Sequence, residues 1–175
     1  MVVKLATYNI AFKGLKEGNH VFDYHIADSF FEHFENTLVD QADVNVRVTL
    51  EKRSSFMSVI LDLKGTVLLT CDRCLEMYNQ PVQNKAQFWI KFGENREEED
   101  DVIWLPPEDY QINVAQIIYE YIILSVPLKH VHPSNEEGKS SCNPEMLKKI
   151  EEYSRPHEDK SDGRWEQLKN LLNSN

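Results

Sequence analysis

Alternating apolar and polar residues mark the first half of the chain as antiparallel β-structure. The alternation is clearest in residues 44–50, and it returns in residues 57–63 and 86–92. A period of two places one face of each strand in a core and the other face in water. Gly65 follows the second of these runs and predicts a bulge or bend there.

Helical spacing appears later in the chain. Residues 113–126 carry one apolar stripe, Asn113 is a suitable cap, and Pro127 ends the helix because proline donates no backbone hydrogen bond. Pro144 predicts the start of a shorter helix, and residues 165–172 carry apolar side chains at helical spacing.

These patterns predict an α+β fold. We expect an antiparallel, barrel-like β-sheet packed by one long apolar helix, with a helical or irregular C-terminal extension. Residues 1–128 would form the β-rich core domain with its packing helix at 113–126. Residues 129–175 would form a polar, acidic extension that ends in a short helix.

Charge is distributed unevenly along the chain. The net charge is −10, and the sequence pI is about 5.1. Residues 1–93 hold 10 basic and 11 acidic residues, whereas residues 94–175 hold 9 basic and 18 acidic ones. This balance excludes a protein that coats nucleic acid or anionic lipid through a broad basic surface. The acidic run Glu94 to Asp101 predicts a solvated loop.

The expected compartment is the cytoplasm. No stretch of apolar residues reaches the roughly 18 that a membrane span requires, and the N-terminal residues lack the pattern of a secretory signal. Three cysteines in 175 residues do not suggest a disulfide scaffold. We therefore expect no membrane partner.

Cys71-Asp72-Arg73-Cys74 is the sharpest local signal for chemistry. Two cysteines three residues apart can face one point from a tight turn, which is half of a tetrahedral zinc site. His130, His132 and Cys142 follow the predicted long helix, and we predict the set of Cys71, Cys74, His132 and Cys142 as zinc ligands.

Two other interpretations of the cysteine pair stay open. The thiols can be reduced and packed without a metal. The pair can also be a thiol-redox site, although residues 75–80 and Pro81 do not form the helix that such a site uses to lower a thiol pKa. Phosphate-binding, hydrolase and metalloprotease motifs are absent, so we expect no catalytic residue, no enzymatic activity and no small-molecule substrate.

Several stretches, in order, resemble one known family. They are the opening strand and turn, residues 67–75 with the cysteine pair, the acidic interval, residues 112–128 and residues 163–168 with the leucines that follow. Together they are similar to the YceD-type large ribosomal RNA subunit accumulation proteins, long catalogued as a domain of unknown function. The resemblance implies a bacterial cytoplasmic protein, or an organellar one in plants, without established catalysis. Some members carry more cysteines after the helix than the single Cys142 found here.

The resemblance implies a non-enzymatic factor for accumulation of large-subunit ribosomal RNA and ribosome assembly. Its partner would be a ribosomal protein or precursor rRNA. The basic side chains that we predict as RNA contacts are Lys52, Arg53, Lys64 and Arg73, all in the nearly neutral half. The alternatives are a zinc-stabilised protein-interaction module unrelated to ribosomes and a Cys-x-x-Cys thiol oxidoreductase.

Overall fold

A computed structural model describes residues 5–35, 37–39, 41–93, 101–134, 138 and 140–154. Most of the predicted acidic loop and the predicted terminal helix lie outside these residues. The elements follow in the order η1 (Ala6–Tyr8), β1 (Asn9–Ile10), β2 (Gly18–Ile26), α1 (Asp28–Phe31), β3 (Ala42–Lys52), β4 (Phe56–Thr70), β5 (Met77–Phe92), β6 (Val102–Leu105), β7 (Ile112–Asn113), α2 (Ala115–Leu124) and α3 (Pro144–Tyr153).

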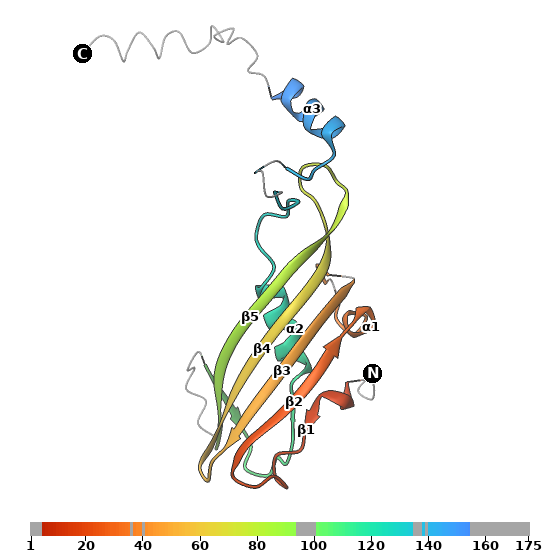
Figure 1. Cartoon of the computed structure of the whole chain (residues 1–175). Helices are drawn as coiled ribbons and strands as arrows, with labels where there is room; N and C mark the ends of the chain where they lie inside the picture. Colours follow the sequence, from red (N-terminus) through yellow and green to blue (C-terminus); the bar gives the residue numbers. More distant parts are fainter. Residues whose placement is uncertain are drawn as a thin grey trace, which may run out of the picture.

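The main sheet is open, with strand order β2-β3-β4-β5-β6 (Figure 1). A separate two-stranded sheet pairs β1 with β7. The α+β class is confirmed, but the predicted barrel is wrong because no hydrogen bonds join β2 to β6 in the described part of the chain. The sheet is also not wholly antiparallel, since β6 runs parallel to β5. Alternation identifies a buried face, but it cannot show whether the edge strands meet.

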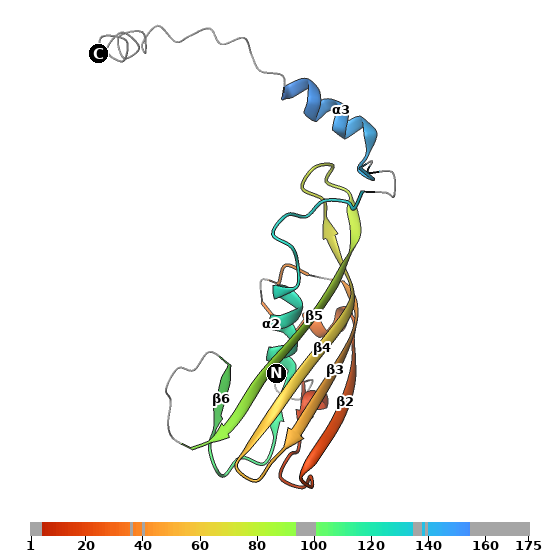
Figure 2. The ribbon, with the colours of Figure 1, turned by 60° about the vertical axis from the view of Figure 1, so that its left-hand side comes forward.

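The buried apolar residues of β3, β4 and β5 lie on one face of the sheet. Val46 pairs with Leu63, and Leu61 pairs with Ala86 across the next interface. α1 and α2 supply further buried residues to this core, and Phe34 stacks on Tyr119 of α2 with ring centroids 4.0 Å apart. Figures 1 and 2 show both helices on the same side of the sheet, and no described helix covers its other face.

The packing helix is shorter than predicted. α2 covers Ala115–Leu124 rather than residues 113–126, so no long apolar helix is present in the described residues. Asn113 belongs to β7, where it pairs with Asn9, and its Oδ1 accepts a hydrogen bond from the backbone N–H of Ala115 at 3.0 Å. The predicted N-cap is therefore wrong by one residue, since Val114 occupies that position, although the Asn113 side chain still bonds the first backbone N–H of the helix.

β5 is much longer than the alternation in residues 86–92 predicted. It begins at Met77, directly after the cysteine turn, and passes through Pro81. The N–H of Trp89 points to β6, where it donates to the Asp101 carbonyl at 2.8 Å. Pro81 lies eight residues before Trp89 in the same strand, so its backbone nitrogen also faces the side away from β4. The proline therefore costs the β4–β5 ladder no hydrogen bond.

Gly65 marks a close approach between strands and not a bulge. β4 keeps one continuous register with β3 and with β5 through this position. A Cβ atom at residue 65 would overlap the backbone of Asp43 and Val44 on the neighbouring strand. Glycine is therefore required here by the distance between the two backbones.

The predicted helix after Pro144 is confirmed as α3, with Asn143 Oδ1 accepting from the N–H of Glu145 at 2.9 Å. In both views α3 projects beyond the end of the β4–β5 hairpin (Figures 1 and 2). The proposed domain boundary at residue 128 stays a prediction. Among the described helices, none has the length and apolar character to cross a membrane.

We predict that Gly65→Ala lowers the free energy of unfolding by about 3 kcal/mol, because the added Cβ forces β3 and β4 apart. Urea unfolding followed by circular dichroism measures the change. Gly14→Ala is the matched control, since a Cβ at residue 14 meets no atom within 4 Å. Equal stability of the two variants would contradict the close approach.

Candidate metal centre

Residues 71–76 form the turn that joins β4 to β5. The N–H of Cys71 donates to the Glu76 carbonyl at 2.9 Å, and the N–H of Leu75 donates to the Cys71 carbonyl at the same distance. Leu75 adopts a φ of 61°, which lets the chain reverse directly after Cys74. The turn brings both cysteine side chains inward, where they are buried.

The four predicted metal ligands lie together. The ligand atoms of Cys71, Cys74, His132 and Cys142 are all within 4.8 Å of one another. Two of the separations are 3.6 Å, between the sulfurs of Cys71 and Cys142, and 3.4 Å, between Cys74 Sγ and His132 Nδ1. Tetrahedral zinc with ordinary bond lengths would give about 3.8 Å and about 3.5 Å for these pairs. The residues therefore fit a metal ion bound by three cysteines and one histidine.

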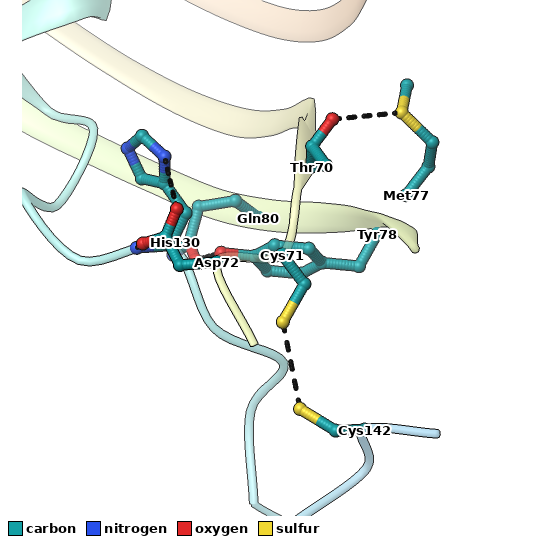
Figure 3. Close-up of polar contacts among 8 residues, drawn as sticks. All are labelled: Thr70, Cys71, Asp72, Met77, Tyr78, Gln80, His130 and Cys142. Carbon is teal, nitrogen blue, oxygen red and sulfur yellow. Dashed lines mark hydrogen bonds and ion pairs between the residues drawn. The ribbon is translucent and has the colours of Figure 1, made fainter. Parts of the chain in front are cut away.

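The second histidine of the same segment, His130, has a different role. Its backbone N–H donates to Asp72 Oδ2 at 2.7 Å, and its carbonyl accepts from the Asp72 N–H at 2.7 Å. Figure 3 shows Asp72 beside His130, and the sulfurs of Cys71 and Cys142 facing each other away from that pair. These two backbone links hold the 130–132 segment against the turn and direct His132 into the cluster.

The electrostatics of the cluster favour a thiolate at Cys71. Burial would raise the pKa of this thiol, but backbone N–H groups of residues 73–74 and of His132, with the His132 ring, favour the charged sulfur and lower the pKa to about 5. At Cys142, the Ser140 hydroxyl favours the thiolate, yet burial and the two neighbouring thiols raise the pKa. A divalent cation would bind here by displacing the remaining thiol protons.

Other side chains support the cluster, and the sequence analysis did not identify them. The Tyr78 ring packs on the His132 ring with centroids 4.8 Å apart. Asn143 Nδ2 donates to Glu76 Oε1 at 2.8 Å and connects the base of α3 to the turn. Their roles depend on contacts between segments about 55 to 70 residues apart, which no local pattern could reveal.

The four predicted RNA-contact residues do not form one patch. Lys52 Nζ donates to the carbonyls of Phe12 and Leu15 at 2.9 and 2.8 Å and therefore fastens a loop. Arg53 is paired with Glu51 at 2.6 Å beside the β3–β4 hairpin.

Lys64 is exposed on the open face of β4, and Arg73 is exposed in the cysteine turn. Arg53 and Arg73 lie at opposite ends of β4 and are about 50 Å apart, given the usual rise per strand residue. RNA contact by any of the four stays a prediction.

We predict that Asp72→Ala destabilises the protein by about 1 kcal/mol, because the His130 N–H loses a charged acceptor that is partly exposed. Hydrogen exchange should show faster exchange at the His130 amide. Glu108→Ala, an exposed carboxylate outside this cluster, should leave that amide unchanged. Unaltered exchange in Asp72→Ala would contradict the proposed link.

Comparison with known proteins gives one match. The family model described as the large ribosomal RNA subunit accumulation protein YceD matches residues 59–172. No curated protein and no solved structure matches the chain. The matched region includes the cysteine turn, α2, the segment that carries His132 and Cys142, and α3. The chain therefore belongs to the YceD family, as its sequence resemblance indicated.

Proposed function

We propose that this protein is a cytoplasmic, non-enzymatic factor that supports the accumulation of large-subunit ribosomal RNA. It would act by binding a component of the large subunit, either a ribosomal protein or precursor rRNA. The observation that carries the proposal is the family match over residues 59–172. The name of that family describes the biological role, and the partner and the step in assembly are our inference.

We further propose that the cluster binds zinc in a structural role. Three cysteines and one histidine are the donors that structural zinc prefers, and a complete shell of four protein ligands leaves no open position for a substrate. Bound zinc would join the β4–β5 turn to the segment after α2. Because the four ligands come from distant parts of the sequence, metal binding would stabilise the folded chain.

The low exposure of the sulfurs favours this role over thiol-disulfide exchange. Cys71 is fully buried, and Cys74 and Cys142 are each 3% exposed. A redox site that acts on protein disulfides needs an accessible attacking thiolate. The lowered pKa of Cys71 then suits a metal ligand better than a nucleophile for large substrates.

We predict that the purified protein carries one equivalent of zinc and that His132→Ala and Cys142→Ser lose it, as native mass spectrometry would measure. His130→Ala is the matched control from the same segment and should retain the metal, because both hydrogen bonds to Asp72 use backbone atoms of residue 130 and the ring adds only a contact of 3.9 Å. A stable, metal-free wild-type protein would refute the zinc proposal. Metal loss in His130→Ala as well as in His132→Ala would refute the ligand set.

Depletion of the protein in the organism that encodes it should lower large-subunit rRNA relative to small-subunit rRNA. Quantification of both rRNAs, with re-expression of the wild-type chain as the control, tests this. Unchanged rRNA levels after full depletion would refute the ribosomal proposal. Recovery of a stable complex without ribosomal components would then favour an interaction module unrelated to ribosomes.

A further inference from the structure

We propose that the cysteine turn and α3 form a docking surface for a basic protein of the large ribosomal subunit. We call this surface the tip, and define it by the exposed apolar side chains Leu75, Met77, Ile150 and Tyr153. This inference rests on the proposed function, and it names the kind of partner and the surface that binds it.

Leu75 is the first reason to single out this surface. Its φ of 61° lies in the left-handed region, where a side chain with a Cβ is strained. Glycine or asparagine would allow the same turn more easily. The Leu75 side chain is 68% exposed, so most of it contributes nothing to the core. A strained, exposed leucine is better explained by contact with a partner than by folding.

Met77 and α3 extend the apolar surface from Leu75. Met77 is 57% exposed, and Glu76, which lies between the two in sequence, accepts a hydrogen bond from Asn143 at the base of α3. Ile150 and Tyr153 on α3 are 40% and 85% exposed. They lie three residues apart on one face of the helix. Met146 and Leu147, in the first turn of α3, pack partly against the core, whereas Ile150 and Tyr153 further along are exposed.

The charges around the tip favour a basic protein over RNA. The turn and α3 carry five exposed carboxylates, at Asp72, Glu76, Glu145, Glu151 and Glu152. Four exposed cations of the same region, Arg73, Lys129, Lys148 and Lys149, only partly balance them. An excess of carboxylates repels phosphate groups, whereas an apolar centre with an acidic rim complements a basic protein surface.

The test uses the full chain with its metal and two variants, Leu75→Gly and Leu75→Asn. Both keep the backbone conformation of the turn accessible and remove the apolar side chain. Val21→Thr is the matched control, because Val21 is 55% exposed on the open face of β2, away from the turn. The probes are the protein fraction extracted from purified large subunits and, separately, protein-free large-subunit rRNA.

We expect the wild-type chain to bind a basic ribosomal protein from the extracted fraction. Biolayer interferometry with that protein should give a Kd at least about tenfold weaker for both Leu75 variants, as for the loss of an interface anchor. Val21→Thr should bind like the wild type. The Tm of the Leu75 variants should be no lower than that of the wild type.

Four results would overturn the inference. They are unchanged binding by the Leu75 variants, a clear fall in their Tm, binding to rRNA without any ribosomal protein, and self-association that is lost in Leu75→Gly. Unchanged binding by the Leu75 variants, or binding to rRNA alone, would show that the tip does not bind a ribosomal protein. The second would make Leu75 a folding residue. The fourth would assign the tip to a second copy of the chain.

Complementation distinguishes failure of this inference from failure of the proposed function. In depleted cells the wild-type chain should restore large-subunit rRNA, while Leu75→Gly at equal abundance should restore less. Equal restoration by both chains would overturn only the docking role of the tip. Normal large-subunit rRNA in depleted cells without the wild-type chain would overturn the proposed function itself.

Discussion

The continuous register of β4 with its two neighbours is the constraint on which the rest of the structure depends. β4 pairs with β3 and β5 without interruption, so its odd-numbered residues all face the same side of the sheet. A shift of one residue would move that whole apolar set into water. Gly65 keeps the register possible at a point where a Cβ atom would overlap the backbone of β3. The same pairing places the turn at residues 71–76 at the far end of the hairpin, beyond the helix-covered core.

The core continues into that turn through the buried side chains of Cys71 and Cys74, and the turn needs further stabilisation from another segment. The segment after α2 provides it through the backbone links between Asp72 and His130 and through the inward-facing Cys and His side chains. A metal ion would add a covalent-like cross-link between parts of the chain that are far apart in sequence. The arrangement also fixes the base of α3, since Cys142 and Asn143 immediately precede that helix. The site and the projecting helix are therefore one structural unit.

The fold shows where the charged residues of the two halves of the described chain lie. The β-rich half is nearly neutral, and two of the cations predicted as RNA contacts have partners within the protein: Lys52 bonds loop carbonyls and Arg53 pairs with Glu51. The excess of carboxylates among the described residues near the cysteine turn lies beside exposed apolar side chains. Composition alone argued against a broad nucleic-acid surface, and the fold places these carboxylates beside the surface that we propose for a basic protein.

The alternation in residues 44–50 and 57–63, the helix after Pro144, the four clustered ligands and the family were all predictable from the amino-acid sequence. These features depend on local periodicity, on residue chemistry or on the order of motifs. The open edges of the sheet, the parallel β6, the short α2 and the passage of β5 through Pro81 were not predictable. They depend on which strands and helices come into contact, and the local sequence pattern does not determine such contacts. The links between Asp72 and His130 and the exposure of Leu75 were likewise decided by the tertiary structure, because they depend on how segments distant in the sequence pack around the cysteine turn.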